Sequence, residues 1–205
     1  GDLLQAVGNA SAPVSPVFTL VQTMSMHTPF VVPDQETYRR KVDARLDQLG
    51  IAAARREPYH RQRDIYASVL YTDDALRRFF LQLEQSPRWR NTIVIITGDH
   101  RLPEIPMDTR LERYHVPLIV ASPLLRQPRR IRALSSHFDI APALLAMLSR
   151  QYGVQTPLQT HWMGTGLDTA VEWRNLHSLP LKQTKTDLDD YVSGTHYLGQ
   201  DRLYT

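Results

Sequence analysis

The sequence predicts an α/β fold in which helices cover both faces of a β-sheet. Apolar residues alternate along the chain between strand-like and helix-like spacing, which is the pattern of α/β proteins. Two short runs, 92–97 (TIVIIT) and 116–123 (VPLIVASP), are continuously apolar. Such strands are typical of sheets that are buried on both faces. We find no internal repeat and no low-complexity linker that would break this pattern.

The first part of the chain predicts one strand and two helices. Residues 17–23 (VFTLVQT) form an apolar run behind a loop rich in Pro and Ser, and we expect a buried strand there. The next segment predicts a helix that Asp34 caps and Gly50 ends, and a second helix starts near Asp64 and ends before Pro87. Their buried faces are expected to carry Tyr38, Val42, Leu46 and Leu49 in the first helix, and Ile65, Val69, Leu76, Phe79, Phe80 and Leu83 in the second.

The later part of the chain predicts further strands and one helix. The 92–97 strand leads into a loop with prolines at 101–114, and the 116–123 strand follows. Residues 137–148 (HFDIAPALLAML) predict a helix with Asp139 as its cap and Pro142 in its first turn, where a missing N–H is tolerated. We interpret residues 169–176 (TAVEWRNL) as an edge strand, and the last thirty residues give only weak signals.

Length and composition are those of a globular protein with one well-buried core or two small ones. The 205 residues are 42% hydrophobic and 22% charged, and no apolar run reaches the roughly 18 to 20 residues of a membrane span. Arginine dominates the basic residues, which suits an anionic partner but is also typical of a GC-rich genome. No basic stripe interleaved with aromatics appears, so we expect no nucleic-acid partner. The absence of cysteine excludes disulfides, thiolate metal sites and a cysteine nucleophile within this chain.

Two places in the sequence bring an imidazole to the end of a predicted strand. Asp99 and His100 follow the 92–97 run, where open α/β sheets bind their ligands. Carboxylate and imidazole both bind divalent cations. The alternative is a loop Asp that caps the next segment beside a solvated His. His27 follows the 17–23 run in the same way, and it is either part of the same pocket or a hydrogen-bonded loop residue.

Five segments, in this order, resemble the C-terminal half of the sulfatase-type catalytic domain of the alkaline phosphatase superfamily. They look most like lipoteichoic acid synthases and membrane phosphoglycerol transferases. The segments are QTMSMHTPF (22–30), YASVLYTDDALRRFF (66–80), NTIVIITGDH (91–100), YHVPLIVASPLL (114–125) and SSHFDIAPALLAML (135–148), with GDLL (1–4) and MGTGLD (163–168) as weaker matches. The resemblance covers residues 1–170 and implies a three-layer αβα sandwich around a mostly parallel sheet. Residues 171–205 would be an extension that packs on the same domain.

The resemblance also implies roles for the candidate residues. Asp99 and His100 would be two ligands of a catalytic divalent cation, which is manganese, magnesium, zinc or calcium in this superfamily. His27 would contact the phosphoryl or sulfuryl oxygens of the substrate or assist the leaving group. Either Asp73 or Asp74, and also Asp139, match structural positions. An arginine at position 101, immediately after the ligand pair, differs from the residues that the family pattern leads us to expect there.

The implied activity is that of a metal-dependent transferase or hydrolase acting on phosphate or sulfate esters. Transfer of phosphoglycerol or phosphoethanolamine is favoured, with a lipid headgroup or glycan as substrate. The reaction would take place on the periplasmic or extracellular face of the cytoplasmic membrane. Parts of the protein that are not in this chain would anchor it there. The nucleophile and a further acidic ligand belong to the front half of such domains. We therefore expect that this chain carries only part of the active site and is inactive alone.

Two other interpretations remain open. The first is a catalytically degenerate relative that keeps the sulfatase fold as a binding or regulatory module. The second is a phosphatase or phosphodiesterase of the same superfamily. The expected partner of this chain is the missing N-terminal half of the domain. An isolated half would expose an apolar edge, and a dimer would cover it.

Overall fold

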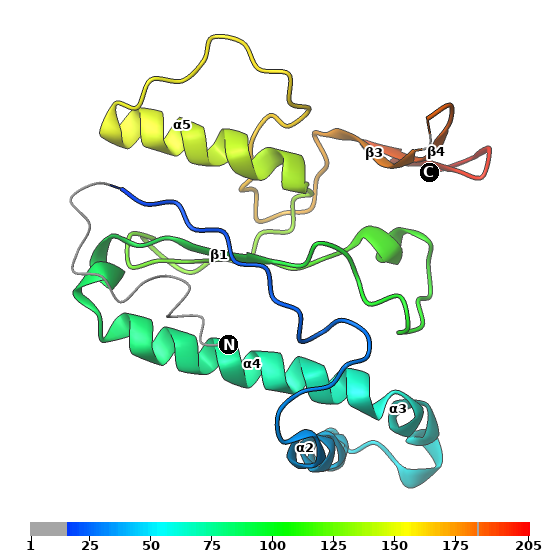
Figure 1. Cartoon of the computed structure of the whole chain (residues 1–205). Helices are drawn as coiled ribbons and strands as arrows, with labels where there is room; N and C mark the ends of the chain where they lie inside the picture. The colour runs from blue at the N-terminus through cyan, green and yellow to red at the C-terminus, as the bar shows by residue number, and fades with distance from the viewer. Residues whose placement is uncertain (1–15, 184) are drawn as a thin grey trace. The chain divides into compact units, whose positions relative to one another are not determined.

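The computed structural model describes residues 16–183 and 185–205, and Figure 1 shows their fold. The chain divides into two compact units, of which the first ends at Arg126 and the second is Gln127–Thr205. We describe each unit by itself, and the division predicted at residue 170 stays a prediction. The described helices are α2 (Gln35–Gln48), α3 (Glu57–Arg61), α4 (Arg63–Glu84) and α5 (Ile140–Tyr152), with the short 3-10 helices η1 (Ala53–Arg55), η2 (Pro87–Asn91), η3 (Leu111–Tyr114) and η4 (His137–Asp139). The strands are β1 (Val94–Thr97), β2 (Leu118–Ala121), β3 (Ser178–Gln183), β4 (Leu188–Ser193), β5 (His196–Gly199) and β6 (Arg202–Tyr204).

Helix α2 forms where the apolar spacing predicts it, but it begins differently. Asp34 has a left-handed backbone (φ 54°) and makes no side-chain cap, so the predicted cap is wrong. Gln35 instead connects the start of the helix to the preceding loop, because its Oε1 accepts a hydrogen bond from the N–H of Val32 at 2.8 Å. The predicted end at Gly50 is confirmed. Its φ of +65° is one that glycine adopts without steric cost, and it lets the N–H of Ile51 donate to Leu46 O at 3.0 Å.

The core of the first unit lies between α2 and α4, which cross at a steep angle in Figure 1. The rings of Tyr38 and Tyr71 meet edge to face, with their centroids 5.4 Å apart. Leu49 and Val69 were expected on the buried faces but are exposed. The buried cluster comprises Val32, Tyr38, Val42, Leu46 and Ala67, with Ile51, Tyr59, Tyr66, Leu70 and Tyr71 packed against it.

Strands β1 and β2 lie inside the two predicted apolar runs, but they pair antiparallel, with Val94 opposite Ala121 and Thr97 opposite Leu118. The connection between them holds only η3 and no covering helix. A parallel pair needs a long crossover, which is usually a helix. The described strands thus form two antiparallel sheets, β1–β2 and β3–β4–β5–β6. They confirm a mixture of helix and strand, but they do not form the mostly parallel sheet of a three-layer αβα sandwich.

The run at 17–23 forms no strand, so this prediction is wrong. Phe18 and Leu20 are 81% and 85% exposed, and the segment pairs with no strand of the described chain. An apolar run becomes a strand only where a neighbouring strand accepts its backbone hydrogen bonds.

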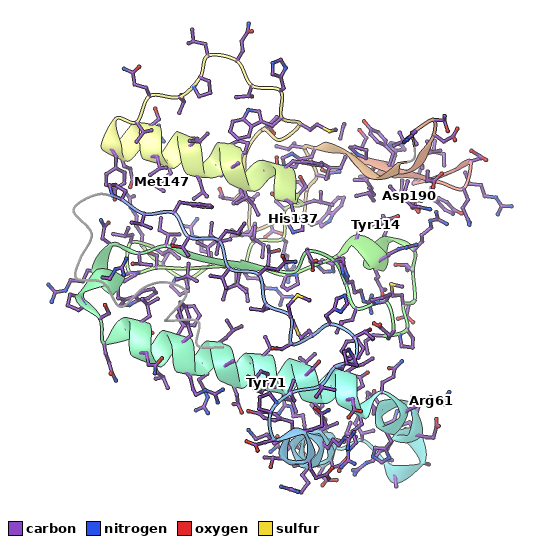
Figure 2. The ribbon with its side chains drawn as sticks, in the orientation of Figure 1. Arg61, Tyr71, Tyr114, His137, Met147 and Asp190 are labelled. Atoms are coloured by element: carbon purple, nitrogen blue, oxygen red, sulfur yellow. The ribbon has the colours of Figure 1, made fainter. Side chains whose placement is uncertain are left out.

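In the second unit, α5 confirms the predicted helix, and Pro142 lies in its first turn. Residues 169–176 form no strand. The strands lie further on, in the antiparallel meander β3–β4–β5–β6, which the sequence did not predict. Asp190, labelled in Figure 2, is fully buried on β4 and accepts a hydrogen bond from the hydroxyl of Tyr197 at 2.8 Å. Acidic residues inside β4 weaken its strand pattern, which explains the omission.

Among the helices of residues 16–183 and 185–205, none combines the length and the apolar character that a membrane crossing requires.

Candidate functional site

Asp99 and His100 lie directly after the carboxyl end of β1, in the first unit. Their side chains are 75% and 63% exposed, so both are open to solvent. Gly98 shapes this exit from the strand. A Cβ at position 98 would lie 3.3 Å from the carbonyl oxygen of His100 and 3.4 Å from Cγ1 of Val116. Those contacts are tight, so glycine suits a chain that turns out of the strand close to its neighbour.

The two side chains face each other. Oδ1 of Asp99 accepts a hydrogen bond from the backbone N–H of His100 at 3.0 Å. Its other oxygen, Oδ2, lies 3.8 Å from Nε2 of His100. Two ligands that are each about 2.1 Å from one cation lie at most about 4.2 Å apart. One divalent ion can therefore bind both atoms with little movement of either side chain.

The imidazole of His100 is also held in a defined tautomer. Its Nδ1 lies 2.7 Å from the carbonyl oxygen of Arg101. A carbonyl only accepts hydrogen bonds, so Nδ1 carries a proton, and in the neutral imidazole the lone pair is on Nε2. Histidine ligands of metals are commonly held in this way, with one nitrogen bonded to a backbone carbonyl and the other on the metal.

His27 lies in an exposed turn and shows the same local arrangement. Its Nδ1 lies 2.9 Å from the carbonyl oxygen of Thr28, which leaves the lone pair on Nε2. The turn is held by hydrogen bonds from the N–H of His27 to Met24 O at 3.1 Å and from the N–H of Phe30 to His27 O at 2.8 Å. The buried ring of Phe30 anchors the end of this turn.

The structure brings Asp99 and His100 together, but it adds no third ligand to them. In the described part of the chain, no three His, Asp or Glu side chains gather into a cluster that could hold a metal ion. His27 therefore does not join the pair in such a cluster, and its placement in the same pocket stays a prediction. Asp99 and His100 fit a divalent cation by their chemistry and spacing, as two ligands of a larger set.

Sequence reasoning missed an ion pair in the loop that follows. The guanidinium of Arg101 donates to Oε2 of Glu112 at 3.0 Å and to the carbonyl oxygen of Pro106 at 3.0 Å. Glu112 comes from η3, whose last residue, Tyr114, is labelled in Figure 2. Its partners lower the pKa of the Glu112 carboxyl, first the side chain of Arg101 and then the N–H of Asp108. No local sequence pattern indicates this pair, because it closes an irregular loop.

A pocket of about 400 Å³ opens elsewhere in the first unit, between the α3 region and the 101–114 loop. Its walls include Arg55, Tyr59, Tyr66, Ile105 and Pro106, and burial raises the pKa of the Tyr66 hydroxyl. Its lining does not include the candidate ligands or His27. The candidate metal pair thus lies on an open surface rather than in this pocket.

The comparison with protein families gives a match over most of the chain. The family model described as sulfatase matches residues 3–149. This range contains His27, Asp99 and His100, and it ends before the β3–β6 meander. No solved structure matches the chain.

Proposed function

The chain belongs to the sulfatase family, in the alkaline phosphatase-like superfamily, and on this basis we propose that it takes part in phosphoryl or sulfuryl transfer from phosphate or sulfate esters. Family membership supports an enzyme that hydrolyses or transfers such esters, and sulfatase-family enzymes generally use a divalent metal. The observation that carries the proposal for this chain is the 3.8 Å separation of Asp99 Oδ2 and His100 Nε2 at the end of β1, within the matched residues.

Asp99 and His100 would hold the cation, which we propose is manganese, magnesium, zinc or calcium. When bound, such an ion lowers the pKa of the attacking nucleophile and neutralises charge that develops on the transferred group. Asp99 contributes Oδ2, because its Oδ1 already accepts the hydrogen bond from the N–H of His100. His100 contributes the lone pair on Nε2.

His27 would act on the substrate rather than on the metal. With Nδ1 bonded to Thr28 O, its Nε2 is the nitrogen that can meet an ester oxygen. As a neutral imidazole it accepts a proton there, and as an imidazolium it donates one to the leaving oxygen. The exposed position of this turn is compatible with contact to a bulky substrate such as a lipid headgroup or glycan.

We infer that the pair is one part of the metal site. Zinc is bound by at least four ligands and the other candidate cations by six or more, whereas Asp99 and His100 offer two. The described residues supply no third carboxylate or imidazole beside them. The remaining ligands and the nucleophile would come from other groups, and the chain alone would be inactive.

The order of the five motifs supports a narrower proposal. It favours transfer of phosphoglycerol or phosphoethanolamine groups on the periplasmic or extracellular face of the cytoplasmic membrane. The alternative is a catalytically degenerate module that keeps the sulfatase fold. In that case, metal binding at Asp99 and His100 would persist without turnover.

A titration with Mn²⁺ tests the ligand assignment. We expect the chain to bind Mn²⁺ no more tightly than at micromolar concentration, and we expect Asp99→Asn and His100→Gln to abolish this binding. Asp201→Asn and His161→Gln change the same residue types at exposed positions of the second unit, and they should leave binding unchanged. Binding by the two ligand variants equal to that of the parent would refute the assignment. Sub-micromolar binding by the parent would refute the partial site.

Turnover in the intact protein tests the reaction. Its rates with p-nitrophenyl phosphate, the corresponding diester and the sulfate separate a monoesterase, a diesterase or transferase, and a sulfatase. Asp99→Ala should lower kcat by more than about 100-fold, because changes that only misorient a metal ligand already cost about 10- to 100-fold. Full activity in this variant would contradict the proposal. Mn²⁺ binding without turnover on any of the three esters would favour the degenerate module.

A further inference from the structure

The direction of the His100 ring depends on one backbone group. Because Nδ1–H donates to the carbonyl oxygen of Arg101 at 2.7 Å, the position of that carbonyl decides where Nε2 points. In this structure Nε2 lies 3.8 Å from Oδ2 of Asp99. Any movement of the backbone at residue 101 would move the lone pair away from its partner.

The side chain of Arg101 fixes that backbone to the far end of the loop. One guanidinium nitrogen donates to Oε2 of Glu112 and another donates to Pro106 O, both at 3.0 Å. The same carboxylate oxygen accepts a hydrogen bond from the N–H of Asp108 at 3.3 Å. Only 24% of the Arg101 side chain is exposed, so this ion pair is partly shielded from water. Hydrogen bonds between charged groups are stronger than neutral ones.

The other hydrogen bonds of the loop include those from the N–H of Ile105 to Leu102 O at 3.3 Å and from the N–H of Glu112 to Thr109 Oγ1 at 3.4 Å. Between Leu102 and Arg110 the loop contains no helix or strand, although Gln62 donates a hydrogen bond to the carbonyl oxygen of Glu104. Closing an irregular loop costs conformational entropy. Without the contacts of Arg101, the backbone beside His100 would be free to sample other conformations.

We propose that Arg101 and Glu112 form a clamp that positions the imidazole of His100 and sets its tautomer. Arg101 is in this view a positioning residue that acts through its own carbonyl, and Glu112 is its anchor. The use of the clamp in metal binding rests on the proposed function. The tautomer of His100 can be measured whether or not a metal binds.

Nitrogen-15 NMR of the neutral histidines in the metal-free chain tests the clamp directly. In the parent, we expect His100 to be mainly the Nδ1–H tautomer. Glu112→Gln and Arg101→Lys should each shift the tautomer ratio at His100 by about two- to tenfold, the equivalent of one net hydrogen bond. Glu104→Gln changes an exposed carboxylate of the same loop and should have no effect.

His27 is an internal control in the same spectra. Its Nδ1 also donates to the next carbonyl, but no arginine–glutamate pair among the described residues holds that turn, so its tautomer should not change in any variant. An unchanged ratio at His100 in both variants would overturn the proposal. An equal change at His27 would also overturn it, because that result indicates general loosening rather than positioning.

Mn²⁺ titration then separates the clamp from the proposed function. If the parent binds Mn²⁺, Glu112→Gln should weaken binding by about 10- to 100-fold. Unchanged affinity together with a changed tautomer would overturn the role in metal binding. If neither the parent nor the variants bind Mn²⁺ while the tautomer shifts as expected, the positioning stands and the assignment of a metal site fails.

Discussion

The carboxylate of Asp139 lies 3.5 Å from Nδ1 of His177 in the second unit, and both side chains are buried. Asp139 also accepts hydrogen bonds from the N–H of Ser136 at 2.7 Å and from the N–H of Thr165 at 3.0 Å. One carboxylate therefore connects the start of η4, the 163–168 segment and the residue before β3. The sequence predicted Asp139 as the cap of the helix at 137–148, but its side chain makes no cap hydrogen bond to α5. The structure instead shows a capping box with Ser136 at η4.

Replacing Asp139 by Asn should destabilise the second unit by about 1–3 kcal/mol. Burial opposes the charged form of Asp139, but the hydrogen bonds from Ser136 and Thr165 outweigh it, and the pKa of this carboxyl lies below its usual value. An amide NH₂ cannot accept hydrogen bonds, so one set of buried donors would lose its partner. Urea unfolding of the chain measures the effect. Asp201→Asn, at an exposed position, is the control. Equal stability of the two variants would contradict this role for Asp139.

Gly164 should not tolerate even a methyl group. A Cβ at this position would lie 1.8 Å from the carbonyl oxygen of Phe138, which is backbone and cannot rotate away. We expect Gly164→Ala to lower stability by about 1–3 kcal/mol, as overpacking does in cores. The neighbouring exposed change Thr165→Ala should have an effect within about 0.5 kcal/mol. Thermal unfolding followed by circular dichroism compares the two, and a harmless Gly164→Ala would show that the close approach does not exist.

Leu46 in α2 and Leu49, the residue that follows this helix, compare a buried leucine with an exposed one. Leu46 is 4% exposed in the core, whereas Leu49, three residues later, is 58% exposed. Leu46→Ala should cost about 2–5 kcal/mol, because it removes buried methyl groups and leaves a cavity. Leu49→Ala should cost less than about 0.5 kcal/mol. If denaturant unfolding gave similar losses for both, the α2–α4 core would be placed wrongly.

Acid should destabilise the first unit. A hydrogen bond from Arg39 lowers the pKa of Asp64, and a hydrogen bond from Lys41 lowers the pKa of Asp74. Since the folded pKa values lie below the unfolded value of about 3.9, these carboxylates stabilise the fold above that pH. The stabilisation is lost as the pH falls through the lowered values. The urea midpoint of unfolding should therefore decrease as the pH is lowered from 6 to 2.5.

Asp64→Asn supplies the test of this assignment. The variant has no carboxylate at position 64 to titrate, so its urea midpoint should depend less on pH than that of the parent. Asp34→Asn, which changes an exposed Asp, should keep the full dependence. An identical pH dependence in the parent and in Asp64→Asn would show that Asp64 does not contribute.

The helices were largely predictable because their cause is local. Apolar spacing around Tyr38, Val42 and Leu46 located α2, and Gly50 marked its end. The cap at Asp34 could not be predicted in the same way, since capping depends on the backbone conformation, and Asp34 has a left-handed backbone from which its side chain makes no cap hydrogen bond. Residues 17–23 show the opposite case. Their apolar pattern alone indicated a strand, but a strand also needs a paired neighbour, which no local pattern reveals.

The sequence by itself determined the family, the helical segments, the two apolar strands and the candidate ligands Asp99 and His100, because each of these depends on residues close together in the chain. Only the tertiary structure decided that β1 and β2 pair antiparallel and that Arg101 reaches Glu112. The physical reason is the same for both. Strand direction and loop closure follow from where residues that are separated in the chain meet, and the order of residues along the chain does not specify those meetings.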